Sequence, residues 1–361
     1  QAGRPLTRHG HAVFRGRQAG VPRHLQLTQR RPAAGVARRQ RILRRQRPLG
    51  AKHREPSTGL HRRWRAGCRI RALAPTDGGL LYYRTDLLEK YGLAVPQTWD
   101  ELGVAAKTIQ DGERAEGNAA FWGFVFQGKA YEGLTCDALE WQVSNGGGRI
   151  LSPEGVIEVN DPASIEIFDK IAGWVGDIVP PDVLNYEEEG ARAVWQAGNA
   201  AFMRNWAYAY PLGQAEDSPI RDKFGVGPVP GKEAGMSAAT LGGWGIGVSR
   251  YSQNIEAASA FAIWVTSYDQ LVDFHLARGE QPAMPALYQD AQLLEALPYL
   301  ASMGNVLESA IPRPGVAGAQ YNAVSELYYT AVNGVLAGSA DAATAMADLE
   351  LAFADLGFEL P

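Results

Sequence analysis

The sequence predicts an α/β fold from residue 72 onward, with more helix than strand. Short apolar runs bounded by glycine or proline alternate along the chain with longer amphipathic stretches, and this alternation is typical of α/β proteins. Hydrophobic residues make up 46% of the sequence, which is enough for large cores. A chain of 361 residues exceeds one ordinary domain, so we expect two domains or lobes.

The first elements follow from turn and capping signals. Leu80–Tyr83 is an apolar run that comes after two glycines, and it predicts a buried strand. A helical stretch over 86–91 is stopped by Gly92. Thr98 and Glu101 have the spacing of a capping box, in which each side chain bonds the backbone amide of the other residue. This pair predicts the start of another helix.

Later elements continue the alternation. Asp161 followed by Pro162 predicts a helix start, because a carboxylate caps the free amides and proline suits the first helical position. The chain is Ala-rich and helical from Ala323 onward. Further strands are expected at 122–128, 200–203, 224–230 and 244–249, and further helices are expected to begin at 131, 187 and 252.

Four side chains test how far the pattern predicts burial. Phe202 lies in the strand that is expected to end at Met203, and we expect it in the core. Trp174 and Trp264 lie on apolar helical faces, so both are expected to be buried core residues. His275 is the only histidine beyond residue 71, and we expect it to be a solvated or capping residue.

The charge is divided very unevenly along the chain. Residues 1–71 contain 19 arginines and one lysine but a single acid, Glu55, whereas the rest of the chain is strongly acidic. This segment suits a nucleic-acid-binding arm or an Arg-rich leader. A third hypothesis, which we favour, is that it represents GC-rich coding DNA read in a shifted frame, because Asp, Asn, Tyr and Met are all absent from it. We therefore expect no nucleic-acid partner.

Several classes of protein receive no support from the sequence. No apolar run is long enough to span a membrane, and Cys68 and Cys136 give neither a metal-site spacing nor a disulfide framework. Phosphate-binding loops, a G-x-S-x-G nucleophile elbow and an H-E-x-x-H metal helix are all missing. The chain begins at Gln1 without a signal segment, so we expect a fragment or a processed form.

A glycoside hydrolase remains an alternative because carboxylates are plentiful. That chemistry needs two carboxyl groups on either side of a sugar, one of them with a raised pKa. The candidates are Asp77, Glu132, Asp137 and Glu140. The last three share one predicted helix, so the competing interpretation is a solvated acidic face.

Aromatic residues favour a different kind of site. Trp206 follows a predicted strand, and Trp244 lies between Gly243 and Gly245. Loops at strand ends form binding sites, and glycine lets the backbone approach a ligand closely. An indole face can cover the apolar side of a sugar ring, so these tryptophans are either ligand contacts or ordinary core residues.

Five segments together resemble the extracellular solute-binding proteins of ABC sugar transporters, and in particular the trehalose/maltose-type branch. They occur in the order of that family, and they are TDGGLLYYRTDLLEKYGLAVPQTWDEL, YEGLTCDALEWQVSNGG, ARAVWQAGNAAFMRNWAYAYPLG, TLGGWGIGVSRYS and IPRPGVAGAQYNAVSELYYTAVNGVLAG. Two features depart from the family. Leu73-Ala74-Pro75 replaces the usual aromatic pair before TD, and residues 1–71 show no counterpart of the opening βαβ units.

The resemblance implies a set of sugar-binding positions. Trp206 and Tyr208 match residues that stack on and hydrogen-bond the sugar, and Trp244 with Gly243 matches the next stacking residue and a backbone contact. Arg313 matches an arginine that binds hydroxyl groups, for which a guanidinium fork is suited. Asp77 matches an acid at the end of a strand of lobe one, and Tyr131 matches a contact from lobe two.

The resemblance also implies a two-lobe periplasmic-binding-protein fold that closes on its ligand at a hinge. Lobe one would keep only residues 72–84 and 249–306, and lobe two would comprise 85–248 and 307–361, with crossovers near 83–86 and 246–249. The implied protein is a non-catalytic, extracytoplasmic monomer without metal or cofactor. It would bind a di- or oligosaccharide and deliver it to an ABC permease.

Overall fold

The computed structural model describes residues 68–301, 303, 306 and 310–361, and within strand β1 it describes only the backbone before Thr76. The chain divides into two compact units, residues 1–62 and 63–361, and the account that follows concerns the second unit. The hypotheses for the basic segment 1–71 therefore fall almost entirely outside the described residues.

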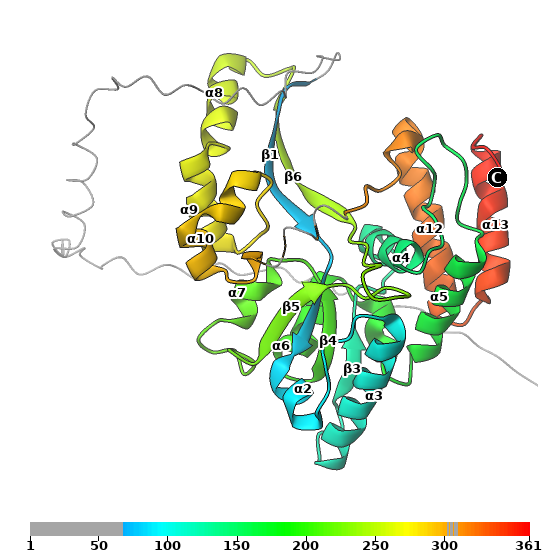
Figure 1. Cartoon of the computed structure of the whole chain (residues 1–361). Helices are drawn as coiled ribbons and strands as arrows, with labels where there is room; N and C mark the ends of the chain where they lie inside the picture. Colours follow the sequence, from blue (N-terminus) through cyan, green and yellow to red (C-terminus); the bar gives the residue numbers. More distant parts are fainter. Residues whose placement is uncertain (1–67, 302, 304–305, 307–309) are drawn as a thin grey trace, which may run out of the picture. The chain divides into compact units, whose positions relative to one another are not determined.

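A four-stranded mixed sheet forms the centre of the second unit (Figure 1). Its strand order is β3-β4-β2-β5; β2 pairs antiparallel with β4 and β5, and β3 pairs parallel with β4. The strands are β2 (Leu80–Arg84), β3 (Trp122–Val125), β4 (Ala200–Asn205) and β5 (Phe224–Pro228). Strands and helices alternate along the sequence, so the predicted α/β class is confirmed.

A second, two-stranded sheet joins segments that are far apart in sequence. β1 (Cys68–Gly78) runs antiparallel to β6 (Leu241–Ser249). Its register places Asp77 opposite Gly242 and Thr76 opposite Gly243. This pairing brings the end of β1 beside the glycine-rich start of β6, which matters for the site described below.

Helices surround the two sheets, and α4, α5, α12 and α13 pack against one another. The α-helices are α2 (Thr85–Tyr91), α3 (Trp99–Ala115), α4 (Glu132–Ser144), α5 (Pro162–Trp174), α6 (Glu188–Gln196), α7 (Ala209–Gly213), α8 (Ile255–Val265), α9 (Tyr268–Arg278), α10 (Ala291–Ala296), α12 (Tyr321–Leu336) and α13 (Ala342–Asp355). The short 3-10 helices are η2 (Pro181–Asn185), η3 (Pro285–Gln289) and η4 (Gly315–Gln320). In the described part of the chain no helix is both long and apolar enough to cross a bilayer.

The predicted helix caps are confirmed. At the start of α3 the amide of Glu101 donates to Thr98 Oγ1 at 3.2 Å, and Glu101 accepts from the Thr98 amide at the same distance. At the start of α5 the Asp161 carboxylate accepts from the amide of Ala163 at 2.8 Å. These interactions span two or three residues, which is why the sequence alone shows them.

Two apolar clusters lie on opposite faces of the central sheet. Alternate side chains of a strand point to opposite faces, so Leu81 and Phe202 join one cluster with α3, α4, α5, α12 and α13. Leu80, Tyr82 and Met203 join the other cluster, which includes residues of α6, β5 and the segment from α9 to α10. Phe202 is fully buried, as expected.

Three local expectations are wrong. β4 continues beyond Met203 to Asn205, because Arg204 and Asn205 pair with Leu81 and Leu80 of β2. Trp264 is 54% exposed, since the described neighbours of α8 cover only one of its sides. His275 is fully buried, because it shares a face of α9 with Leu271. Trp174, which was also expected to be buried in the core, is only half-buried; it packs against the core, and its ring meets the Phe124 ring edge-on.

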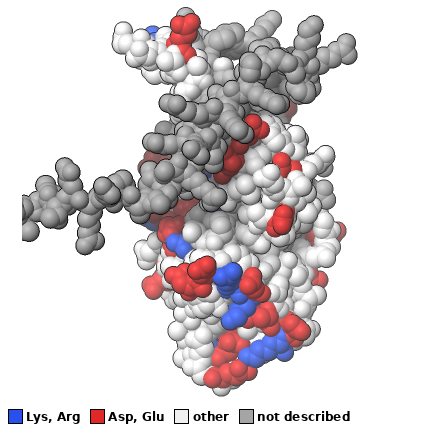
Figure 2. Space-filling view, turned by 90° about the vertical axis from the view of Figure 1, so that its left-hand side faces the viewer, with Lys and Arg blue, Asp and Glu red and all other residues white. Residues whose placement is uncertain are grey.

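Basic side chains on the second unit lie among acidic ones. On the face drawn in Figure 2 they adjoin carboxylates rather than forming a separate basic patch. Ion pairs such as Lys90–Glu113 and Lys107–Asp111, both at 2.7 Å, occur on the described surface of this unit. The described residues visible on this face therefore offer a polyanion no broad basic surface.

Candidate functional site

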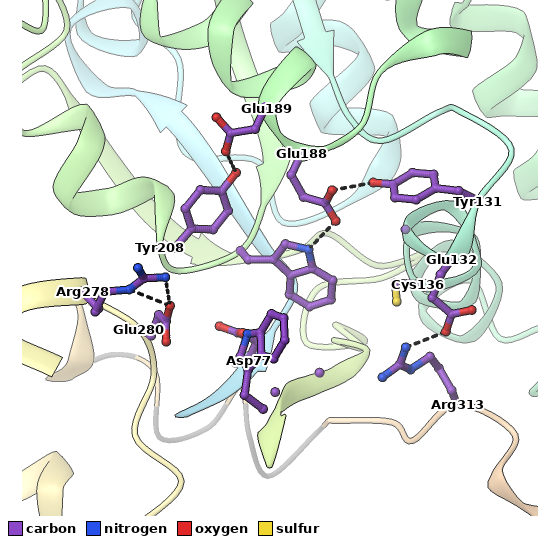
Figure 3. A pocket seen from close by; sticks show the side chains of 15 residues that line it. Asp77, Tyr131, Glu132, Cys136, Glu188, Glu189, Tyr208, Arg278, Glu280 and Arg313 are labelled. Carbon is purple, nitrogen blue, oxygen red and sulfur yellow. Dashed lines mark hydrogen bonds and ion pairs between the residues drawn. The ribbon is translucent and has the colours of Figure 1, made fainter. Parts of the chain in front are cut away.

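A cavity of about 460 Å³ collects residues from segments far apart in the sequence. All seven residues that the resemblance pointed to line it: Asp77, Tyr131, Trp206, Tyr208, Gly243, Trp244 and Arg313. Eight further residues complete the lining: Glu132, Gly133, Cys136, Glu188, Glu189, Gly242, Arg278 and Glu280. Figure 3 shows their side chains converging from several elements.

The positions of these residues follow from where the elements end. Asp77 lies near the end of β1, opposite Gly242 at the start of β6. The tryptophan and tyrosine at 206 and 208 directly follow β4. Helix starts supply the residues of 131–133 and the acids at 188–189, and the end of α9 supplies Arg278. Backbone at element ends is open to ligands, which favours binding there.

Trp206 is held on several sides. The guanidinium carbon of Arg204 lies 4.0 Å from the centre of its ring system, which is cation–π geometry. The indole Nε1 donates to Glu188 Oε1 at 3.3 Å, and the backbone oxygen accepts from the Tyr82 hydroxyl at 2.7 Å. A Cβ atom on Gly242 would approach the ring to 3.2 Å, so glycine there permits close packing. The indole is thus fixed before any ligand arrives.

Arg204 is fully buried beneath Trp206 in a cluster of charges. It donates to both oxygens of Glu140, at 2.8 and 2.6 Å, and to Gln127 at 2.9 Å, and it lies 3.0 Å from Asp137 Oδ1. Burial lowers the pKa of Arg204, but the two carboxylates raise it by more, so the guanidinium stays charged. Burial raises the pKa of Asp137 well above its usual range, although Arg204 opposes this effect.

From the sequence alone, the alternative to a hydrolase site is a solvated acidic helix face. That interpretation is wrong for Asp137 and Glu140. Their side chains are 0% exposed, since Arg204 from the neighbouring strand needs them as counter-charges. Neither residue lines the cavity. A glycine is required next to this cluster, because a Cβ on Gly79 would lie 1.9 Å from Glu140 Oε1 and 2.5 Å from Arg204 Nη2.

Two tyrosines of the cavity donate to the acids at the start of α6. The Tyr131 hydroxyl donates to Glu188 Oε2 at 2.8 Å, and the Tyr208 hydroxyl donates to Glu189 Oε1 at 2.7 Å. Burial, followed by these carboxylates, raises the pKa of both phenols above the usual range. Both hydroxyls therefore stay protonated at neutral pH.

Arg313 and Glu132 form an ion pair at the side of the cavity nearest α4. Arg313 Nη1 lies 2.5 Å from Glu132 Oε1. The carboxylate also accepts from Ser325 at 2.5 Å and from the Tyr321 hydroxyl. These contacts fix the guanidinium of Arg313, which leaves other N–H groups that can bind a ligand.

Trp244 and Gly243 lie on β6. Gly243 has a φ of 127°, a conformation that favours glycine. Trp244 is 70% exposed, so its ring is largely available for contact. Trp206 and Trp244 thus differ in kind, since the first is locked by protein contacts and the second is open.

Asp77 and Glu280 form an acidic side of the cavity. Both side chains are buried, and Glu280 accepts from Arg278 Nη2 at 2.9 Å. Burial raises the pKa of Asp77 to about 7, and the nearby Glu280 contributes to the rise, whereas Arg204 opposes it. Glu280 was missed by the sequence analysis, because nothing in the run RGEQP distinguishes it from a surface acid.

Glu188 and Glu189 were also missed as site residues. The run Glu187–Glu189 signals the start of a helix, but a helix start gives no indication of what faces it.

Within the described residues, no group of three or more His, Cys, Asp or Glu side chains has the arrangement of a metal site.

The chain has clear relatives among known proteins. Residues 70–271 match the family model described as bacterial extracellular solute-binding protein. A probable ABC transporter-binding protein of Deinococcus radiodurans is 47% identical over 277 residues, which cover 76% of this chain and 66% of that protein. A mannitol-binding protein of Pseudomonas aeruginosa is 24% identical over 204 residues, covering 54% of this chain and 45% of that protein. The chain thus spans about two thirds of the first relative's length and less than half of the second's.

Solved structures agree with these matches. Maltose-bound MalE3 of T. maritima superimposes with a TM-score of 0.73 at 38% identity, and the match covers 79% of this chain and 72% of that one. A solute-binding protein of Agrobacterium vitis with bound D-mannitol gives a TM-score of 0.69 at 21% identity, covering 80% and 72% of the two chains. The expected two-lobe α/β fold is confirmed by the first match. The second match supports the fold alone.

Proposed function

Because the chain belongs to the family of bacterial extracellular solute-binding proteins, we propose that it is the solute-binding component of an ABC sugar transporter. The proposed ligand is a di- or oligosaccharide of the maltose or trehalose type, which is bound without chemical change. The implied partner is an ABC permease, the implied location is outside the cytoplasm, and the protein is expected to act as a monomer. The lobe boundaries given above remain predictions.

One observation carries this proposal. Seven residues from segments far apart in the sequence, selected by resemblance to sugar-binding proteins, line a single cavity. Its volume of about 460 Å³ lies in the range of small-molecule sites. The seven residues would bind a sugar by aromatic stacking and by hydrogen bonds to its hydroxyl groups.

Aromatic and polar groups are combined as a sugar requires. Trp206 and Trp244 offer indole faces for the C–H side of a pyranose ring. Tyr131 and Tyr208 already donate to carboxylates, so their hydroxyl oxygens are free to accept from a ligand. Arg313 supplies N–H donors, and Asp77 supplies carboxylate oxygens. Buried sugar hydroxyls need such partners, since unpaired polar groups are destabilising.

The similarity to one solved structure supports the ligand type. The MalE3 structure contains maltose at 38% identity to this chain. Other solved relatives hold mannitol or ribitol at 21 to 24% identity, and they bear on the fold rather than on the ligand. Maltose is therefore the first probe to use.

Calorimetry and tryptophan fluorescence of the full chain test the proposal. We expect saturable maltose binding with a fluorescence change and without glucose release. Trp244→Ala should weaken binding by about tenfold to a hundredfold, because a central aromatic anchor contributes about 2 kcal/mol or more. Trp264→Ala is the matched control: this tryptophan is 54% exposed and lies outside the cavity.

Two outcomes would contradict the proposal. If no mono-, di- or oligosaccharide binds the chain, the sugar-receptor function fails. If maltose or trehalose is hydrolysed at a rate that depends on Asp77, the protein is a glycoside hydrolase instead. If Trp244→Ala and Trp264→Ala weaken maltose binding equally, the cavity is not the binding site.

A further inference from the structure

Two carboxylates at one side of the cavity each have an oxygen that no group of the described residues satisfies. Asp77 is 9% exposed and Glu280 is 4% exposed. Asp77 Oδ1 and Glu280 Oε2 are buried and have no hydrogen-bond partner among the described residues. Both residues line the cavity, and Figure 3 shows them on the same side of it.

The backbone fixes these two residues beside each other. Glu280 follows α9, and the next residue, Gln281, is hydrogen-bonded to β1 on either side of Asp77. The amide of Thr76 donates to the Gln281 backbone oxygen at 2.9 Å, and the amide of Gly78 donates to Gln281 Oε1 at 2.6 Å. The proximity of the two acids is therefore built into the fold.

This arrangement is unfavourable without a ligand. A buried carboxylate oxygen normally accepts a hydrogen bond, and burying it without a donor costs free energy. The two acids also repel each other, and this repulsion adds to the burial that raises the pKa of Asp77 to about 7. Unsatisfied acceptors that line a cavity are explained if a ligand supplies the donors.

We propose that Glu280 is a further ligand-binding residue, and that it and Asp77 together accept hydrogen bonds from two hydroxyl groups of one sugar ring. This inference rests on the proposed sugar-binding function and specifies how one ring is held. Asp77 was expected as a contact from the sequence resemblance, whereas Glu280 follows only from the structure.

The hydrogen-bonding groups around the pair suit the hydroxyl groups of a sugar. Arg278 donates to Glu280 Oε1 at 2.9 Å and also lines the cavity. A hydroxyl group both donates and accepts, so it can bond the carboxylates and a guanidinium N–H at once. An ammonium group only donates, so it could bond the carboxylates but could not accept from Arg278.

Ligand binding should then depend on pH. The charged and titratable groups that surround Asp77, from every element packed against it, are Glu280 and Arg278 at the end of α9, buried His275 of α9, Arg204 of β4, Tyr82 of β2, and Tyr288 and Tyr299. Burial lowers the pKa of His275 to about 4, and burial raises the pKa of the three tyrosines above their usual range. The pKa of Asp77, at about 7, therefore lies near neutrality, whereas those of His275 and the three tyrosines do not.

The sign of the effect follows from the role of the carboxylate. Sugar hydroxyls donate to the ionised form, so binding removes the proton from Asp77. Affinity should rise with pH and level off above about 8. The ionised fraction of a group with a pKa near 7 increases about tenfold between pH 6 and pH 8, and the affinity should increase by the same factor.

Calorimetry with maltose from pH 5.5 to 8.5 tests the proposal on the full chain. Glu280→Gln should weaken binding at pH 8 by about tenfold to a hundredfold, because a charged hydrogen-bond acceptor is lost. It should also move the midpoint of the pH profile to lower pH, since a negative neighbour of Asp77 is removed. Asp77→Asn should abolish the profile near pH 7. The midpoint shift follows from the charge of Glu280 alone, so the loss of affinity at pH 8, where Asp77 is already ionised, is the result that reports contact between Glu280 and the sugar.

Glu166→Gln is the matched control. Glu166 forms a surface ion pair with Lys232 at 2.7 Å outside the cavity, and its loss should leave both affinity and profile unchanged. Thermal unfolding of each variant shows whether it has folded. The pH profile of the unaltered chain needs no variant, so it tests the proposal even if Glu280→Gln does not fold.

The possible failures are distinguishable. If the unaltered chain binds no sugar, the proposed function itself fails. If it binds maltose but the pH profile is flat, or Glu280→Gln binds as the unaltered chain does at pH 8, only the inference about Glu280 is overturned. If glucosamine binds more tightly than glucose, the two carboxylates bind a cationic group of the ligand rather than two hydroxyl groups, and the proposal is wrong.

Discussion

Removing the positive charge of Arg204 should destabilise the fold strongly. Arg204→Met keeps an unbranched side chain of similar length but leaves two buried carboxylates, Glu140 and Asp137, without their cation. Breaking a buried ion pair by removing one partner costs about 3–5 kcal/mol. Loss of the cation–π contact to Trp206 adds about 0.5–2 kcal/mol. We expect a loss of about 3.5–7 kcal/mol in the free energy of unfolding at pH 7.

The loss should depend on pH in a defined direction. Burial already raises the pKa of Asp137 in the folded protein, and Arg204 limits that rise. Without Arg204 the folded state holds the proton of Asp137 more tightly than the unfolded state does. A raised folded-state pKa gives stability at low pH that is lost as pH rises. The variant should therefore lose more stability between pH 5 and pH 8 than the unaltered chain does.

Urea unfolding followed by tryptophan fluorescence measures this effect. Arg221→Met is the control, because Arg221 is about half exposed and lies 3.6 Å from its partner Asp222. Such surface pairs contribute about 1 kcal/mol or less. A variant Arg204→Met within 1 kcal/mol of the control at pH 7 would refute the role assigned to the buried cluster. So would a loss of stability that shrinks as pH rises.

Three further predictions concern individual sites. Gly79→Ala should lower the free energy of unfolding by about 1–3 kcal/mol in urea unfolding, because its Cβ would overlap the locked carboxylate of Glu140. By contrast, Gly173→Ala inside α5 meets no neighbouring atom and should stabilise by about 0.5–1 kcal/mol. Thr98→Ala should cost about 1 kcal/mol in thermal unfolding, since α3 loses its capping box. Burial raises the pKa of Cys136 to about 12, so iodoacetamide at pH 8 should modify it only in the unfolded chain, as mass spectrometry of its peptide would show.

Each of these has an outcome that contradicts its reason. Equal effects of Gly79→Ala and Gly173→Ala would mean that the space around Gly79 is not restricted. An unchanged melting temperature for Thr98→Ala would leave the capping box without energetic importance. Modification of Cys136 in the folded chain at the rate of a free thiol would show that the residue is accessible and ionises normally.

Local signals in the sequence were reliable where the interaction itself is local. The capping box of Thr98 and Glu101, the cap at Asp161 and the strand at Leu80–Tyr83 all appear in the structure. Each depends on residues within a few positions of one another, so neighbouring segments do not alter the outcome.

Burial was less predictable, because it depends on what packs from elsewhere. Trp264 lies on an apolar helix yet is 54% exposed, while His275 and Glu140 are polar yet buried. Glu140 is inside because Arg204, 64 residues later in the chain, supplies its counter-charge. Helical periodicity shows which side chains share a face, but it does not show which face is covered.

The sequence by itself determined the α/β class, the principal helix starts and, through family resemblance, seven residues that meet in one cavity. The tertiary structure alone decided that Glu280 lies beside Asp77 and that Arg204 is buried beneath Trp206. The physical reason is the range of the interactions. Caps and periodic patterns act over a few residues, whereas Gln281 reaches β1 across about 200 positions of chain, a pairing that no local pattern encodes.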